Sequence, residues 1–420
     1  MNIEDSLKKL FSLHTFGIKL GLDNIKKFLD TIGNPQLQLK TIHVAGSNGK
    51  GSTSAFLASM LKEFGYKVGL YTSPHFVRFN ERVKINGLEI PDEYVADFIS
   101  KHEKYIDDNK LTFFEVTTAI AFQYFYDKKV DHAIIEAGLG GRLDATNVLN
   151  PLACVITSIS LEHTNILGET LEKIAFEKAG IIKKYVPVYT GILPPEAKSI
   201  IQDKCIELNS PLNCLQDYII KRGSSIELYT EEIELDDFTM PLKGDYQKLN
   251  AALAGLVISR TFQSDDFAHI EKGIRNVFEN TGIQGRYEFY NQRPDIIFDS
   301  AHNEDGIKNF ISEFRKDSKH YSKKVLLFGA MRDKNISSML KELNNYFDEI
   351  FVTEIDYERA AKIEEIKNIA AGINVNVLAA KNYIEFIDAF MNNSTGDCLV
   401  VLGSMYLIGS IKAQIQNKIA

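Results

Sequence analysis

The stretch Gly46-Ser-Asn-Gly-Lys-Gly-Ser52 combines the residue types that hold a phosphate group. It follows a β-branched run, Thr41–Val44, that is typical of a buried strand, and apolar residues at helical spacing come after it. Between a strand and a helix, backbone N–H groups and the positive end of the helix dipole point at an anion. Lys50 adds a charge, and the Ser52 hydroxyl can bind Mg²⁺. The stretch predicts a nucleotide phosphate site made by Gly46, Asn48, Gly49, Lys50, Gly51 and Ser52.

The spacing differs from the usual nucleotide loop, which has four residues between its first glycine and the Gly-Lys pair. Here only Ser47 and Asn48 intervene, and Gly51 separates Lys50 from Ser52. The alternative interpretation is a glycine turn that joins a strand to a helix and carries a solvated lysine.

Three more polar residues follow predicted strands. Ser73 comes after 68–72, Glu136 after 133–135, and His163 shortly after 152–158. Strands that alternate with helices predict a parallel sheet, and such sheets bind ligands at the carboxyl ends of their strands. We therefore expect Lys50, Ser73, Glu136 and His163 to converge.

Each of these residues also has a structural interpretation. Glu136 is a Mg²⁺ ligand, because a hard cation prefers carboxylate oxygen, or it caps the amides of the loop 138–141. His163 is a ligand or a hydrogen-bonded structural histidine, and Ser73 is a ligand or part of a proline turn. Lys178 lies near the end of a predicted helix that Gly180 terminates, where a solvated lysine is the plain expectation.

Length and composition limit the classes of protein to which the chain can belong. The chain has 420 residues, 45% hydrophobic and 25% charged, which predicts a soluble globular protein of two domains. A net charge of −8 argues against non-specific nucleic-acid binding. Four scattered cysteines, no apolar signal segment and no apolar run of about 18 residues predict a cytoplasmic protein without a membrane span.

The elements that must position these residues form an α/β fold. Residues 1–285 predict an α/β domain with a mainly parallel sheet, an irregular stretch at 76–91, and a small antiparallel addition. Residues 286–420 predict a second, smaller α/β domain, with strands at 296–298, 325–328, 350–353, 375–378 and 398–402. In it, Asp299-Ser-Ala-His-Asn303 either holds ribose or a reacting group, or starts a helix capped by Asn303. Arg286 stands at the domain boundary, where it can reach a phosphate.

Taken together, the segments resemble the folylpolyglutamate synthase/dihydrofolate synthase family within the Mur-ligase superfamily. The matching stretches are Gly46–Ser52, Thr72–His75, Glu136–Asn147, Glu177–Ile181, Asn250–Ala252, Gly285-Arg286, Asp299–Asn303 and Gly403–Leu407. The run Glu136-Ala-Gly-Leu-Gly-Gly-Arg-Leu-Asp-Ala-Thr-Asn147 is highly specific, and the others follow in the family's order. Three positions depart from the pattern: Glu162 replaces a common aspartate, Ser300 a glycine, and Lys19 an acid.

The resemblance implies that residues 1–285 form an ATP-binding domain and residues 286–420 a smaller Rossmann-like domain, with the active site in the cleft between them. It implies that ATP contacts the stretch Gly46–Ser52, called the phosphate loop below, together with Asn250, Arg286 and Asp299. It also implies two Mg²⁺ ions, held by Ser52, Ser73, Glu136 and His163, and carboxylation of Lys178 by CO₂. The pterin would lie near Thr112, Phe113, Phe114 and Glu115 and near Leu143, Asp144 and Ala145, with His302 on the glutamate side.

The activity implied is ATP-dependent addition of L-glutamate to dihydropteroate, to folates, or to both, through an acyl phosphate, by a monomer with small-molecule partners only. The alternatives are folylpolyglutamate synthase activity alone, a peptidoglycan-precursor ligase, and a regulatory or transport ATPase without amide chemistry.

Overall fold

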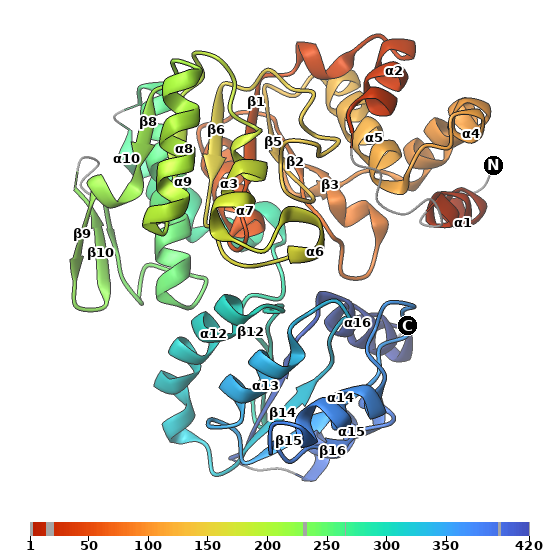
Figure 1. Cartoon of the computed structure of the whole chain (residues 1–420), viewed down its shortest axis with the longest axis vertical. Helices are drawn as coiled ribbons and strands as arrows, with labels where there is room; N and C mark the ends of the chain where they lie inside the picture. The colour runs from red at the N-terminus through yellow and green to blue at the C-terminus, as the bar shows by residue number, and fades with distance from the viewer. Residues whose placement is uncertain (1–2, 14–20, 230–232, 265, 394–395, 420) are drawn as a thin grey trace. The chain divides into compact units, whose positions relative to one another are not determined.

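The computed structural model describes residues 3–13, 21–229, 233–264, 266–393 and 396–419 (Figure 1). Lys19 lies outside these residues. The chain forms two compact units. Unit 1 comprises residues 1–74, 79–241 and 248–282, and unit 2 comprises residues 75–78, 242–247 and 283–420.

Unit 1 is built on an eight-stranded sheet in the order β4-β3-β2-β5-β1-β6-β7-β8. All neighbours pair in parallel except β2 with β3 and β3 with β4. The central strands are fully buried, as continuous apolar runs predict for a parallel sheet covered on both faces. The strands are β1 Thr41–Ala45, β2 Val68–Tyr71, β3 Val83–Ile85, β4 Leu88–Glu89, β5 His132–Glu136, β6 Ala153–Ile156, β7 Val188–Thr190 and β8 Leu212–Cys214.

Helices cover this sheet, and α3 leads directly out of β1. The side of α3 away from the sheet contacts α10 and α11, where Glu63 of α3 accepts hydrogen bonds from Asn276 (2.9 Å) and Asn280 (2.8 Å). The α-helices are α1 Ile3–Ser12, α2 Asp23–Thr31, α3 Lys50–Glu63, α4 Asp92–Asp108, α5 Phe113–Asp127, α6 Thr164–Leu167, α7 Leu171–Ala179, α8 Pro195–Glu207, α9 Asp245–Phe262, α10 Phe267–Arg275 and α11 Val277–Thr281.

The predicted antiparallel addition forms a three-stranded sheet of β9 Ile219–Arg222, β10 Ser225–Leu228 and β11 Ile233–Leu235. Two local predictions are wrong. The stretch 76–91 is not irregular throughout, because it contains a 3₁₀ helix, Phe79–Arg82, and strands β3 and β4. The strand predicted at 152–158 comprises only Ala153–Ile156, and beyond it the side chains of Thr157 and Ser158 contact the phosphate loop.

Unit 2 contains a six-stranded sheet in the order β12-β13-β17-β14-β15-β16, parallel except for β12. One face packs on α12 to α14 and the other on α15 and α16, which gives two apolar clusters. The predicted strand 375–378 is wrong, because β16 comprises only Leu378–Ala379. The elements are β12 Glu288–Asn291, β13 Asp295–Phe298, α12 Glu304–Asp317, β14 Lys324–Phe328, α13 Ile336–Leu343, β15 Glu349–Val352, α14 Ile363–Ala371, β16, α15 Tyr383–Asn393, β17 Cys398–Leu402 and α16 Met405–Ile419.

Candidate active site

The phosphate loop is held in a shape that only glycine permits at two positions. A Cβ on Gly46 would lie 1.9 Å from Thr157 Oγ1, and a Cβ on Gly49 would lie 2.5 Å from Asn250 Oδ1. Gly49 also adopts φ +86° as the N-cap of α3, so the first turn of α3 begins at Lys50. The loop therefore presents a helix N-terminus at the end of β1, as the sequence predicts for a phosphate site.

Hydroxyl groups after β6 fix this loop from one side. Asn48 O accepts hydrogen bonds from Thr157 Oγ1 (2.6 Å) and Ser158 Oγ (2.9 Å), and Ser47 Oγ donates to Ser160 O (3.1 Å). These serines and this threonine were not predicted as site residues. The sequence feature that could have indicated them is the run of hydroxyl residues Thr157-Ser-Ile-Ser160 at the end of a predicted strand.

Two lysines meet at one carbonyl of the loop. Lys50 Nζ and Lys178 Nζ each donate to Gly46 O at 2.8 Å, and Lys50 also donates to Ser47 O (3.1 Å). Lys178 reaches the loop because α7 packs beside it, and its side chain is 1% exposed. The expectation of a solvated Lys178 is therefore wrong.

The partner of Lys178 is Glu162, at 2.6 Å from Nζ to Oε1, with only 5% of the Glu162 side chain exposed. Burial opposes its ionisation, but the adjacent Lys178 and Lys50 charges lower the pKa of Glu162 to about 2. Burial first, and then the charge of Lys50, lowers the pKa of Lys178. Glu162 is thus a buried carboxylate within the phosphate-loop cluster, and sequence reasoning gave it no role.

Glu136 lies at the neighbouring strand end. β5 pairs with β1 so that Glu136 stands opposite Val44, two residues before Gly46. Its Oε2 accepts a hydrogen bond from Ser73 N (3.1 Å), which brings the ends of β2 and β5 together. The pairing of β6 with β1 places the segment before His163 on the other side of the loop. His163 adopts φ 44°, a left-handed conformation of the kind that clusters at functional sites.

The Asp144 carboxylate holds the loop that follows Glu136. The buried Asp144 carboxylate accepts hydrogen bonds from the amides of Gly138, Leu139 (2.8 Å) and Thr146 (3.0 Å). Burial raises the pKa of Asp144 despite these donors. Among the predicted pterin residues, Asp144 therefore uses its carboxylate to bind amides of its own loop, and Leu143 and Ala145 are its neighbours in the chain.

The other predicted pterin segment starts α5. Thr112 and Glu115 form a capping box, with Thr112 N to Glu115 Oε2 at 2.8 Å. Phe113 stacks on Phe11, with ring centroids 5.7 Å apart, and Phe114 fills the space that a side chain at Gly138 would need. Of the two rings, only Phe114 is partly exposed beside the glycine loop, because Phe113 is 4% exposed and belongs to the core, and the polar groups of the segment cap the helix.

In unit 2, Asp299, Ser300 and His302 follow β13. Asp299 accepts from Tyr287 N and Ala301 N, both at 2.8 Å, and burial raises its pKa. Arg286 donates to Ser300 Oγ, and His302 Nδ1 donates to Ser300 O (2.9 Å), so Nδ1 carries the proton. Asn303 caps α12 by accepting from Gly306 N (2.8 Å), which confirms the helix-start interpretation for that residue.

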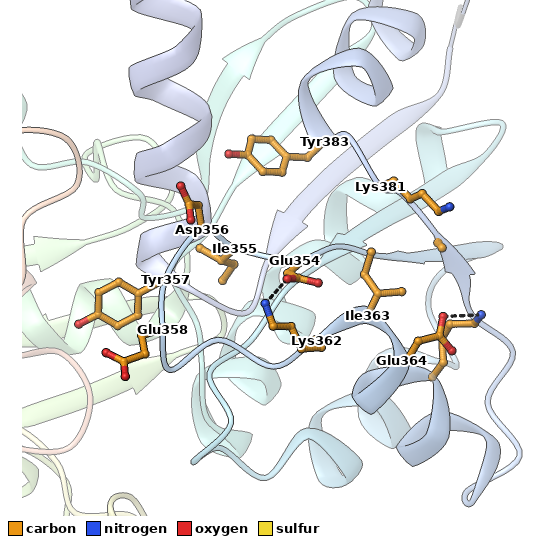
Figure 2. A pocket seen from close by; sticks show the side chains of 12 residues that line it. Glu354, Ile355, Asp356, Tyr357, Glu358, Lys362, Ile363, Glu364, Lys381 and Tyr383 are labelled. Carbon is orange, nitrogen blue, oxygen red and sulfur yellow. Dashed lines mark hydrogen bonds and ion pairs between the residues drawn. The ribbon is translucent and has the colours of Figure 1, made fainter.

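A pocket of about 820 Å³ lies at the carboxyl ends of β15 and β16 (Figure 2). Its lysines are largely matched by carboxylates: Lys362 pairs with Glu354, and Lys367 with Glu364 at 3.2 Å. It is separate from the strand end that carries Asp299 and contains none of the predicted site residues.

The donor set predicted for Mg²⁺ consists of one carboxylate, one imidazole and two hydroxyls. The structure places Glu136 in contact with Ser73, and Ser52 is 1% exposed in the first turn of α3. Oxygen ligands beside a phosphate loop fit a hard cation. Within the described residues, no three His, Cys, Asp or Glu side chains are grouped to hold a metal, and no helix is long and apolar enough to cross a membrane.

Two domain families match the chain. The Mur ligase middle domain matches residues 44–258, and the glutamate ligase domain of Mur ligases matches residues 285–405. Dihydrofolate synthase/folylpolyglutamate synthase of Bacillus subtilis is 35% identical, with 96% of each chain covered. The protein of the same name from Escherichia coli is 30% identical over 98% of this chain and 95% of its own.

Solved structures agree with the sequence relatives. E. coli FolC in complex with DHPP and ADP superposes with a TM-score of 0.86 at 28% identity, covering 100% of this chain and 99% of that one. Folylpolyglutamate synthase from Thermotoga maritima gives a TM-score of 0.82 at 30% identity, covering 99% and 97%. The chain therefore belongs to the dihydrofolate synthase/folylpolyglutamate synthase family of the Mur ligase superfamily and is an ATP-dependent ligase.

Proposed function

We propose that this protein uses ATP to join L-glutamate to dihydropteroate and to folates, as a bifunctional dihydrofolate synthase/folylpolyglutamate synthase. The observation that carries the proposal is the cluster at the carboxyl end of β1. There the N-terminus of α3, Lys50 and Asn250 contact or form the loop, and the Glu136–Ser73 contact lies at the end of the neighbouring strand β5. This is the arrangement that phosphoryl transfer requires, because positioning and charge neutralisation are the main tasks of the protein in that reaction.

In the first step, the carboxylate of the pterin substrate attacks the γ-phosphate of ATP, which gives an acyl phosphate and ADP. Lys50 and the backbone N–H groups of the loop hold the transferring phosphate. In the second step, the α-amino group of L-glutamate attacks the acyl carbon, an amide forms, and phosphate leaves. The activation is needed because a free carboxylate is a poor electrophile.

Magnesium would be held by Ser52, Ser73, Glu136 and His163, and it would neutralise phosphate charge when bound. Carboxylation of Lys178 belongs to the same proposal. Carbamate formation needs a neutral amine. Burial lowers the pKa of Lys178 although the Glu162 carboxylate opposes this, so the ammonium paired with Glu162 gives up its proton more readily than a solvated lysine would. A carbamate on Lys178 reverses the charge that Glu162 now faces at 2.6 Å.

The remaining predicted roles rest on chemistry that the side chains can supply. Phe114 would offer flat surface for a pterin ring beside the loop that carries Leu143 and Ala145, whereas the buried Phe113 would shape this site through its packing on Phe11. In unit 2, Arg286 and Asp299 would contact the nucleotide, and His302 would act on the glutamate side. We also propose that the enzyme is a cytoplasmic monomer, which size-exclusion chromatography with light scattering tests for the oligomeric state.

The decisive assay measures ATP-dependent incorporation of labelled glutamate, with dihydropteroate and tetrahydrofolate offered separately. Incorporation with both supports the bifunctional enzyme, and incorporation with tetrahydrofolate alone supports folylpolyglutamate synthase. Phosphate release that needs a nucleotide-linked sugar, or that needs no glutamate, would reject the proposal in favour of a peptidoglycan ligase or a simple ATPase.

The variant Lys50→Ala serves as the site control for this assay. Loss of the phosphate-binding ammonium should lower turnover by roughly a thousandfold or more, the size of a lost transition-state charge contact. Near-normal turnover of Lys50→Ala would contradict the role given to the loop.

A further inference from the structure

A second pocket lies at the opposite end of the unit 1 sheet from the phosphate loop. It has a volume of about 600 Å³ and is formed where β1, β5, β6, β7 and β8 begin and where α9 ends. Lys40 stands directly before β1, whereas Gly46 stands directly after it, so the length of the strand, about 15 Å, separates the two sites. The pocket is therefore distinct from the predicted ATP site.

The charge of this pocket is opposite to that of the whole protein. The chain has a net charge of −8, yet Lys40, Arg260 and His132 line the pocket, and none of its described lining residues is Asp or Glu. The nearby Asp131 lies outside it and uses Oδ2 to accept from Lys67 N (2.7 Å). In the pocket of Figure 2, by contrast, carboxylates stand among the lysines.

His132 is a buried polar group whose ring has no hydrogen-bond partner among the described residues. It is 8% exposed, and its Nδ1 is buried without a partner. Tyr66 and Phe262 hold the ring edge-on, with centroid distances of 4.8 and 4.9 Å. Burial and the charge of Lys40 lower the pKa of His132, so its ring is neutral and carries one N–H donor.

A hydroxyl pair adds one more donor. Thr261 Oγ1 and Tyr189 OH share a hydrogen bond of 3.2 Å, which uses only one of the two hydroxyl protons. Around these donors the lining is partly apolar, from Leu152, Pro187, Pro211 and Phe262, and it is completed by the amides of Asn213 and Gln263. Several donors, two cations and no acid are complementary to an anionic group, and the apolar lining is complementary to a ring attached to it.

We propose that this pocket binds a small organic anion, an aromatic or other ring compound that carries a phosphate or carboxylate group. The anionic group lies between Lys40 and Arg260 and accepts a hydrogen bond from His132 Nε2, the ring nitrogen that is not buried, and the ring of the ligand packs on Phe262 and the apolar residues of the lining. This site goes beyond the proposed ligase function, because no substrate of that reaction is assigned to this end of the sheet.

The test uses the full chain with phenyl phosphate, benzoate and benzyl alcohol as probes. Titration calorimetry measures affinity, and NMR of labelled histidine follows the His132 ring. We expect phenyl phosphate or benzoate to bind with a shift of the His132 signals, and the tighter of the two identifies the anionic group. Benzyl alcohol, which has the ring but no charge, should bind at least about tenfold more weakly.

Variants separate this pocket from the phosphate loop. The double variant Lys40→Met/Arg260→Met should weaken binding about tenfold or more, whereas Lys50→Ala and the surface control Lys104→Met should leave it unchanged. Equal affinity in the double variant, loss of binding in Lys50→Ala, or no saturable binding of either anion with an unmoved His132 signal would overturn the proposal.

Discussion

Replacing Glu162 with Gln should destabilise unit 1 strongly, because it leaves the ammonium of Lys178 buried without its counter-charge. The two side chains are 1% and 5% exposed and their charged atoms are 2.6 Å apart. Removing one partner of such a buried pair costs about 3–5 kcal/mol. For a unit of this size, that corresponds to a fall of about 6–10 °C in the unfolding temperature. Calorimetry in metal-free buffer without CO₂ measures it.

A matched control lies on the same helix as Lys178. Glu177 pairs with Arg142 at 2.8 Å, but the Arg142 side chain is 42% exposed, so Glu177→Gln should cost less than about 1 kcal/mol. If Glu162→Gln were no less stable than Glu177→Gln, the buried ion pair would not be what fixes Lys178, and the reasoning would be refuted.

The same variant also reports on carboxylation of Lys178. With bicarbonate and Mg²⁺ present, a carbamate would face Glu162 with a like charge, so removing the Glu162 charge should destabilise the protein less than it does without CO₂. A destabilisation that is identical in both buffers would argue against the modification.

Two further predictions concern α3. Gly49→Ala should raise the KM for ATP at least about tenfold, because its Cβ would collide with Asn250 at 2.5 Å. The control Gly65→Ala has nearly the same φ but open space around the Cβ, so it should lower the free energy of unfolding only by the backbone strain of about 1 kcal/mol. Glu63 has a pKa lowered to about 2: burial would raise it, but hydrogen bonds from Lys272, Asn280 and Asn276 outweigh that effect. Since its folded pKa lies below the ordinary value of 4.5, Glu63 stabilises the protein above that pH, and the stability gap to Glu63→Gln, measured by urea unfolding, should shrink as pH falls from 4.5 toward 2. A gap that is constant with pH would contradict this.

The main elements of the fold could be predicted from local patterns. A buried strand such as Thr41–Ala45 shows as a β-branched run, and a helix end such as Gly180 shows as a glycine after a helical pattern. Both signals involve only residues that are close in the chain, so the sequence reveals them directly. Short strands such as β7 and β16 were missed or misplaced, because a few residues carry little periodicity and their pairing is decided by distant partners.

The sequence by itself indicated the glycine loop between a strand and a helix, the order of the main strands along the chain and the resemblance to the family, since these depend on residue type and spacing. Only the tertiary structure decided which side chains meet. Glu162 and Lys178 are sixteen residues apart and Gly49 and Asn250 about two hundred, and no local pattern records such contacts. Burial also belongs to the whole fold. Lys178 has the same local pattern as a surface lysine, but the packing of α7 against the loop removes it from water and gives it a carboxylate partner.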